Sequence, residues 1–220
     1  MKSIGLRLIF LLSCQMCLVH AGGFASAQDS LRPNARTSEP VWTRWTHQPG
    51  HEAWERRAIS ALKTHASGLV DIVPGDIQNW CPAYPEADDQ DRRAFWVGFL
   101  SALAKYESTY RENAIGGGGR WHGLLQILPG TARSYGCDAG TGAALRDGGA
   151  NLSCALRIMS ATVQRDGVVH GRGSRWLGVS ADWGPMRSRA KRADIAQWTR
   201  AMPPCQSRRS LRPRTRPSQG

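Results

Sequence analysis

Residues 95–108 read Phe-Trp-Val-Gly-Phe-Leu-Ser-Ala-Leu-Ala-Lys-Tyr-Glu-Ser and carry the most informative helical pattern of the chain. Its large apolar residues recur at spacings of one, three and four, which is typical of a helix that buries one face. These residues are Phe95, Trp96, Phe99, Leu100 and Leu103. The acids in residues 88–91 precede them and suit the positive end of a helix. The stretch therefore predicts a core helix that follows these acids.

Glu107 lies on the buried side of this predicted helix. At ~100° per residue it falls between Trp96 and Leu100 on the helical wheel. A carboxylate among apolar side chains is costly unless it has a partner or a use, and burial would raise its pKa as a general acid requires. The alternative is a structural ion pair, with three candidate partners. These are Arg92, Arg93 and Arg111. The helix alone leaves both interpretations open.

Four other segments have helical spacing or helix boundaries. They cover residues 52–65, a short stretch after Pro129 that ends near Gly136, a segment that Asn151 caps, and roughly residues 190–201. No stretch alternates long enough to indicate a large sheet. We therefore expect a mainly α-helical domain with at most a minor β element.

Two short motifs and the segments after them resemble a known family. Residues 104–108 read Ala-Lys-Tyr-Glu-Ser, residues 123–127 read Gly-Leu-Leu-Gln-Ile, and residues 129–132 read Pro-Gly-Thr-Ala. In this order they resemble the soluble lytic transglycosylase domain, a lysozyme-like family. The segment from Asp147 to Leu152 is similar to the family's next segment. The resemblance covers about residues 90–165 and is looser after that.

The chain departs from the family at its third motif, which is usually Ala-Tyr-Asn-Ala-Gly. The nearest counterpart is Ser-Ala-Asp-Trp-Gly-Pro at residues 180–185, which lacks the Tyr-Asn pair. Asp182 and Trp183 are the candidates to replace it.

The resemblance implies a lysozyme-like single domain and a carbon-oxygen lyase activity on peptidoglycan, with no cofactor. Such an enzyme cleaves the bond between N-acetylmuramic acid and N-acetylglucosamine and leaves 1,6-anhydro ends. Glu107 would be its catalytic acid. Ser108 would orient that carboxylate, or cap the helix. Gln126 would hydrogen-bond the substrate, or hold a loop.

Aromatic residues near the motifs are candidates for binding sugars, because their flat rings offer apolar faces with polar edges. They are Tyr110, Trp121, Tyr135 and Trp183, and for each the alternative is core packing. His47 and His51 suggest a metal, but Pro49-Gly50 would break a helix that aligned them. We assign no metal.

The ends of the chain predict export. Lys2 and Arg7, an apolar run and Ala25-Ser26-Ala27 are typical of a signal peptide that is cleaved after Ala27. The alternatives are a membrane anchor, for which the run is short, and a lipoprotein modified at Cys14. We expect a signal peptide (1–27), a polar leader (28–51), the enzyme domain (52–205) and a basic disordered tail (206–220). The product would be periplasmic or secreted.

Four cysteines remain after residue 27, an even number that predicts two disulfides in an exported chain. We favour Cys137–Cys154, which would close a Gly-rich loop, together with Cys81–Cys205. Zinc binding is the alternative, but the sequence has no Cys-x-x-Cys pair after residue 27.

The chain is strongly basic, with a formal net charge of +12. Residues 1–27 hold two bases and no acid, so the remainder keeps +10. Such a charge favours anionic polymers. Peptidoglycan strands fit the motifs, whereas nucleic acid would rest on charge alone. We therefore expect a glycan-binding monomer with no nucleic-acid partner, and a cell-envelope assembly is a candidate partner.

Two rival functions remain open. One is a lysozyme-type hydrolase with a second catalytic acid. Its candidates are Glu112, Asp138, Asp147 and Asp182. The other is a wall-binding factor that does not cut.

Overall fold

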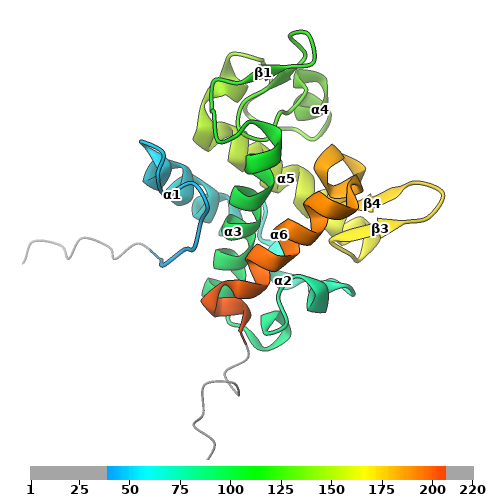
Figure 1. The fold of residues 1–220 in the computed structure, drawn as a ribbon. Coiled ribbons are helices and arrows are strands. Elements are labelled where there is room, and N and C mark those ends of the chain that lie inside the picture. Colours follow the sequence, from blue (N-terminus) through cyan, green and yellow to red (C-terminus); the bar gives the residue numbers. More distant parts are fainter. Residues whose placement is uncertain (1–38, 207–220) are drawn as a thin grey trace, which may run out of the picture. The chain divides into compact units, whose positions relative to one another are not determined.

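The computed structural model describes residues 39–206. The predicted signal peptide, residues 28–38 of the predicted leader and residues 207–220 of the predicted tail lie outside them. The described part is mainly helical, with two small antiparallel sheets, as predicted (Figure 1). None of its helices is long and apolar enough to cross a membrane.

Six α-helices make up most of the domain. They are α1 (His51–Leu62), α2 (Gly68–Asp71), α3 (Asp89–Glu107), α4 (Pro129–Ser134), α5 (Gly148–Asp166) and α6 (Arg189–Ala201). The predicted helical segments correspond to α1, α3, α4, α5 and α6. Short 3-10 helices lie between them. They are η1 (Ile77–Asn79), η2 (Tyr84–Glu86), η3 (Ala144–Arg146), η4 (Val179–Ala181), η5 (Gly184–Arg187) and η6 (Pro203–Cys205).

Each sheet is a two-stranded hairpin. The first pairs β1 (Ile115–Gly116) with β2 (Trp121–His122), and Ile115 lies opposite His122. The second pairs β3 (His170–Arg172) with β4 (Trp176–Gly178), and His170 lies opposite Gly178.

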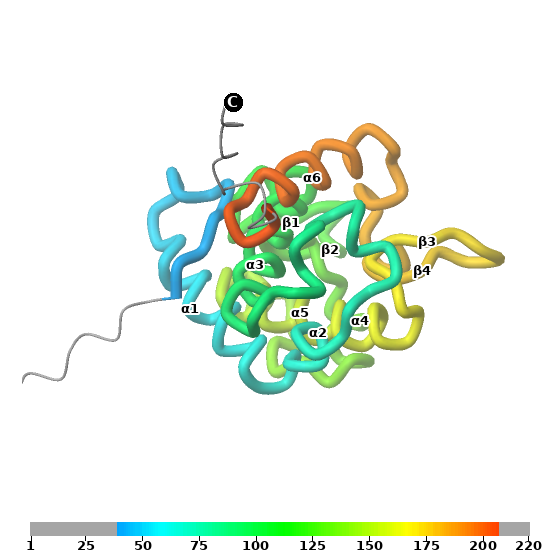
Figure 2. Tube along the Cα trace, turned by 90° about the horizontal axis from the view of Figure 1, so that it is seen from below, coloured from blue at the N-terminus to red at the C-terminus, as the bar shows by residue number. Residues whose placement is uncertain are grey.

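Helix α3 is the central helix of the domain. Asp88 caps it by accepting a hydrogen bond from the backbone N–H of Asp91 at 2.9 Å. Every residue from Ala94 to Ala104 is buried, because α1, α2 and α6 all pack against this helix (Figure 2). The sequence predicted one buried face on this helix, whereas the helix is buried on all sides from Ala94 to Ala104.

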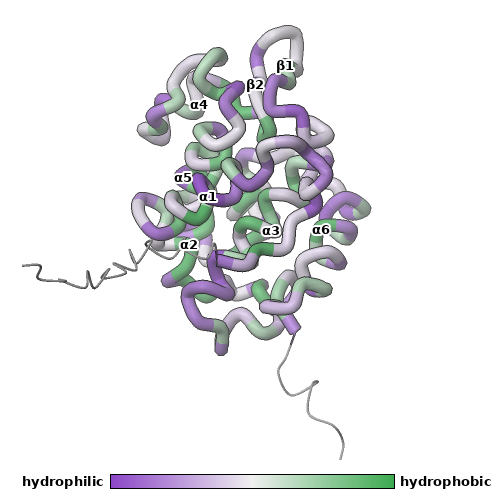
Figure 3. Tube along the Cα trace, turned by 90° about the vertical axis from the view of Figure 1, so that its left-hand side faces the viewer, coloured by the Kyte–Doolittle hydropathy of each residue, from purple (hydrophilic) through white to green (hydrophobic). Residues whose placement is uncertain are grey.

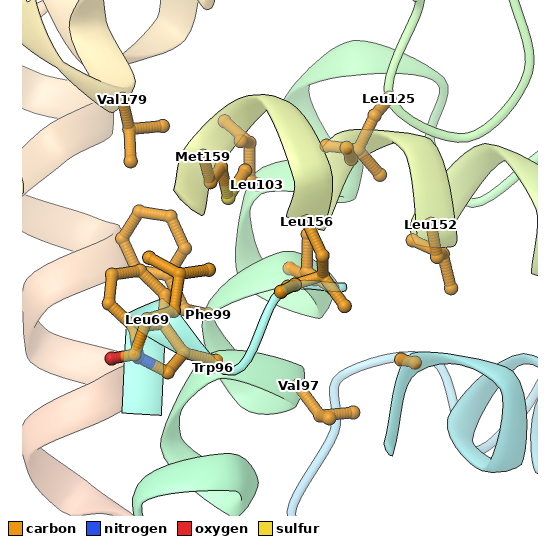
Figure 4. Packing of buried hydrophobic residues seen from close by; sticks show 14 of the residues in the cluster. Leu69, Trp96, Val97, Phe99, Leu103, Leu125, Leu152, Leu156, Met159 and Val179 are labelled. Atoms are coloured by element: carbon orange, nitrogen blue, oxygen red, sulfur yellow. The ribbon is translucent and has the colours of Figure 1, made fainter. Parts of the chain in front are cut away.

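The core joins α3 to α5. Figure 4 shows side chains of both helices within one hydrophobic cluster, together with Leu69, Leu125 and Val179. Hydrophobic positions follow α3 through the interior in Figure 3, whereas many outer segments are hydrophilic. Burying this much apolar surface is the main favourable term in folding.

The predicted start of the domain at residue 52 was wrong. Trp45 has no exposed surface and packs edge-on against Trp54, with ring centroids 5.7 Å apart. The backbone N–H of Arg44 donates to the hydroxyl of Ser101 on α3 at 3.0 Å. Residues 39–51 therefore belong to the domain. Their prolines and polar residues suggested a leader, but the tryptophans supply the apolar surface that anchors them.

Both favoured disulfides are present, Cys81–Cys205 and Cys137–Cys154. The first joins the segment before α3 to the end of the domain, and the second joins the loop after α4 to α5. Two disulfides are typical of proteins in an oxidising, extracytoplasmic compartment.

The sequence suggested that Asn151 caps α5, but it does not. The cap is Asp147, whose side chain accepts a hydrogen bond from the backbone N–H of Ala150 at 2.7 Å. Asn151 is fully buried one turn inside the helix. Its side chain has a different use, because it holds the Gly123–Gln126 loop.

Candidate active site

Glu107 is the last residue of α3 and is half-buried where that helix leaves the core. The chain turns sharply after it. Thr109 and Tyr110 both adopt left-handed backbone conformations, with φ of 54° and 63°. That conformation costs about 1–2 kcal/mol per residue other than glycine, and such strain is found most often at functional sites.

The surroundings of Glu107 favour its protonated form. Burial raises its pKa to about 7, and the positive charge of Lys191 on α6 partly opposes this shift. The carboxyl end of a helix also carries partial negative charge, which acts in the same direction as burial. Within residues 39–206 the carboxylate has no hydrogen-bond or ion-pair partner. A carboxyl group of this kind suits a general acid at neutral pH.

The ion-pair alternative fails because all three candidate arginines have other partners. Arg92 donates to the carbonyl oxygen of Val70 at 2.9 Å. Arg93 binds Glu39 at 3.0 Å. Arg111 donates to the carbonyl oxygen of Ser108 at 3.1 Å.

Two residues next to the motifs make structural hydrogen bonds. The buried hydroxyl of Ser108 donates to the carbonyl oxygen of Ala104 at 3.5 Å, which fits the helix-ending role. The side-chain amide of Gln126 donates to the carbonyl oxygens of Gly123 (2.9 Å) and Ala114 (3.3 Å). Gln126 therefore closes its own loop, and only its side-chain oxygen is left for a substrate.

The four aromatic residues predicted to bind sugars differ in their exposure and contacts. Tyr110 lies three residues after Glu107 and lines a cleft. Trp121 is 38% exposed and carries the Arg120 guanidinium 4.7 Å from its ring centroid. The hydroxyl of Tyr135 lies 3.5 Å from the Asp182 carboxylate.

Trp183 does not fit the predicted role. It is 3% exposed, and its indole N–H donates to the carbonyl oxygen of Leu125 at 3.0 Å. Because its ring faces the core, it cannot stack on a sugar. Its assignment to substrate binding was wrong.

Two adjoining clefts lie beside the segment that follows Glu107. Their volumes are about 550 and 540 Å³, and they share Pro49, Trp54 and Glu112. Tyr110 lines the first, whereas Glu107 lines neither. These clefts could not be predicted from the sequence, because their walls come from segments that are far apart in the chain.

None of the four candidate second acids acts on the pKa of Glu107. Glu112 accepts hydrogen bonds from the indole N–H of Trp54 (3.1 Å) and the backbone N–H of Gly148 (3.2 Å). Asp147 caps α5, Asp182 lies near Tyr135, and Asp138 lines a small pocket beside the Cys137–Cys154 disulfide. Among the described residues no other carboxylate contributes to the pKa shift of Glu107.

The sequence reasoning missed the contribution of α6. Besides Lys191, this helix supplies Asp194, which receives two hydrogen bonds from Arg44 and lies 3.4 Å from the ammonium of Lys105. These contacts keep the pKa of Asp194 well below its usual range, chiefly through Arg44. The basic residues within positions 187–192 could have indicated that this helix brings positive charge to the site. No group of three or more His, Cys, Asp or Glu side chains in the described part is arranged to hold a metal ion.

No protein-family model matches this sequence, and no curated protein matches it either. Three solved structures of the Bdellovibrio protein Bd0314 DslA resemble the domain. Its wild-type form has a TM-score of 0.68 at 27% identity. Two variants, each with one glutamate replaced by glutamine, have TM-scores of 0.70 and 0.67 at 27% and 26% identity. Each match covers 76% of this chain and 98% of DslA, so the two proteins are distant structural relatives.

Proposed function

We propose that this protein is an exported peptidoglycan lytic transglycosylase with Glu107 as its catalytic acid. One observation carries the proposal: an unpaired, half-buried carboxyl group at a helix end, with its pKa raised to about 7. The Glu-Ser and Gly-Leu-Leu-Gln-Ile motifs support it, since they give the substrate class by resemblance.

In the proposed reaction, Glu107 first donates its proton to the glycosidic oxygen as the bond to C1 of N-acetylmuramic acid breaks. The acetamido group of the sugar stabilises C1 as an internal nucleophile. The Glu107 carboxylate then takes the proton of the sugar's 6-hydroxyl, whose oxygen bonds to C1 as the bond between C1 and the acetamido oxygen breaks. Glu107 regains its proton, no water is consumed, and the products are a 1,6-anhydro end and a free 4-hydroxyl.

The electrostatics favour this reaction over a two-carboxylate hydrolysis. Retaining glycosidases keep their two carboxyl groups about 5–5.5 Å apart, and inverting ones about 6.5–9.5 Å apart. A second acid at such distances would raise the pKa of Glu107 further by charge repulsion. Among the charged side chains of residues 39–206, Lys191 alone acts on the pKa of Glu107, and it lowers that pKa. A mechanism in which Glu107 is the only catalytic carboxyl group therefore fits these electrostatics better than a two-carboxylate hydrolysis.

The proposed location is the periplasm or the extracellular space, after cleavage behind Ala27. The two disulfides support an oxidising compartment, and the positive charge suits an anionic wall polymer. We propose that a single chain acts on glycan strands, without a cofactor.

Mass spectrometry of the soluble products from purified peptidoglycan tests the proposal. The mature protein should release fragments that end in 1,6-anhydromuramic acid, and the Glu107→Gln variant should release none. Fragments with reducing ends would instead identify a hydrolase. Binding to peptidoglycan without any product, at pH values from 5 to 8, would identify a wall-binding protein.

A further inference from the structure

We propose that a strip of basic and aromatic side chains, leading from Glu107 to the β3–β4 hairpin, binds the carboxylates of the peptides attached to the glycan strand. This inference rests on the proposed function, because a peptidoglycan substrate brings such carboxylates close to the scissile bond. We call these side chains the basic strip. Its members are Lys105, Tyr106, Arg172, Trp176, Arg187 and Lys191.

The strip begins at the catalytic carboxyl group. Tyr106 directly precedes Glu107, and its half-buried ring carries two ammonium groups: Lys105 Nζ lies 5.2 Å and Lys191 Nζ 5.4 Å from the ring centroid. Lys191 is also the cation whose charge acts on Glu107. A ligand bound at this end of the strip is therefore next to the reacting bond.

The other end is built around Trp176 on β4. The guanidinium of Arg172 lies 4.2 Å and that of Arg187 5.9 Å from its ring centroid. Arg187 is fixed, because it donates to the carbonyl oxygens of Ser180 (2.9 Å) and Ala181 (2.8 Å). The Arg187 guanidinium is thus held near the Trp176 ring before any ligand arrives, which lowers the entropic cost of binding.

The two ends are continuous. Arg187 closes η5 and Lys191 lies in the first turn of α6, which follows directly. Figures 1 and 2 both show the β3–β4 hairpin projecting from the body of the domain next to this junction. Tyr106 contacts Lys191 at one side of the junction, and Trp176 contacts Arg187 at the other.

The positive charge of the strip is only partly neutralised. Asp194 binds Arg44 and Lys105, and Asp182 acts electrostatically on Arg187. Arg172 and Lys191 have no ion-pair partner among the described residues. The first turn of α6 holds bases and no acid. Cations at this end of a helix oppose its dipole, so the stability of the helix does not account for them.

Carboxylates attached to a polymer fit this arrangement. Arg172, Arg187 and Lys191 provide exposed cations, and the rings of Tyr106 and Trp176 provide flat apolar surfaces beside them. The peptides of a glycan strand bear carboxylates at intervals. Neutral glycan would use the rings but not the cations.

A binding assay separates the strip from catalysis. The Glu107→Gln protein, which should not cut, is sedimented with insoluble peptidoglycan at low ionic strength, with and without the added pair Arg172→Gln and Lys191→Gln. The control is the pair Arg56→Gln and Arg200→Gln, which removes the same charge from exposed positions on α1 and at the end of α6. Circular dichroism melts check that all variants fold.

We expect the strip pair to weaken binding about 2- to 10-fold, as for the loss of two exposed ion pairs, and the control pair to change it little. The difference should disappear on peptidoglycan whose carboxylates have been amidated with carbodiimide and ammonia. Equal losses for both pairs would overturn the inference in favour of general charge attraction. A loss that persists on amidated peptidoglycan would overturn it in favour of another anion, such as a phosphate polymer.

A failure of this inference can be told apart from a failure of the proposed function. If the wild-type protein released no 1,6-anhydro products, the proposed function would fail while the binding comparison stayed interpretable. If the wild-type protein released them and the strip pair bound as tightly as its parent, only the present inference would fail.

Discussion

The side-chain oxygen of Asn151 accepts a hydrogen bond from the backbone N–H of Leu125 at 2.9 Å, and this contact ties α5 to the loop that carries the Gly-Leu-Leu-Gln motif. The side-chain nitrogen of Asn151 donates to the carbonyl oxygens of His122 and Leu145, both at 2.9 Å. One buried amide therefore satisfies three backbone groups. Gly123 lies against it, and a β-carbon there would come within 2.3 Å of that nitrogen.

We expect Asn151→Ala to lower the free energy of unfolding by about 2–4 kcal/mol, because buried backbone groups lose their partners at about 1–3 kcal/mol each. Urea unfolding followed by fluorescence measures this change. The neighbouring Ser153→Ala, on the same helix but half-buried, is the control and should change stability by less than about 1 kcal/mol. A loss below about 1 kcal/mol for Asn151→Ala would contradict the assigned role.

The raised pKa of Glu107 predicts a stability difference that depends on pH. A carboxyl group with a folded pKa of about 7 binds its proton more tightly in the folded state than in the unfolded one. Its stabilising contribution is fully present below its unfolded pKa and is lost as pH rises through about 7. Glu107→Gln should therefore be more stable than the wild type at pH 8, by about 2–3 kcal/mol, and similar to it at pH 4. Thermal unfolding at both pH values measures this, and an equal difference at both would contradict it.

Activity should decline as pH rises through about 7, because the acid form of Glu107 is the one that donates the proton. Lys191→Gln removes the charge that lowers the pKa of Glu107, so the decline should move to higher pH. Lys191→Arg keeps the charge and should leave the decline where it is. The pH dependence of kcat/KM on soluble glycan fragments tests this. The inference that Lys191 acts on Glu107 fails if both variants give the wild-type profile.

Trp183 and Trp121 were both candidates for sugar binding, but replacing them should have different effects on stability and activity. Trp183 is buried, so Trp183→Ala should cost about 3–5 kcal/mol of stability. Trp121 is partly exposed on β2, so Trp121→Ala should cost less than about 1 kcal/mol. If Trp121 stacks on the glycan, that variant should show a several-fold higher KM with little change in kcat. Unfolding curves and steady-state kinetics on the same preparations separate the two effects.

Local patterns in the sequence were enough to predict α1, α3, α4, α5 and α6 and the position of the candidate acid, whereas α2 was not predicted. Periodic apolar residues predicted α1, α3 and α5, because a helix face must be apolar wherever it meets a core. The same periodicity placed Glu107 at the buried side of α3. The even number of cysteines indicated two disulfides, and both favoured pairs formed.

The packing of distant segments around the helices could not be predicted from the sequence and is known from the tertiary structure. It brought Trp45 into the core, fixed Trp183 against Leu125, turned Asn151 toward a loop 26 residues earlier in the chain, and placed Lys191 where its charge reaches Glu107. The physical reason is that periodicity reports how apolar a face is, whereas burial, hydrogen bonding and electrostatic fields depend on neighbours from distant parts of the chain. The sequence alone thus indicated a carboxyl group with unusual surroundings, and the packing of α6 and the loops around it determined what those surroundings are.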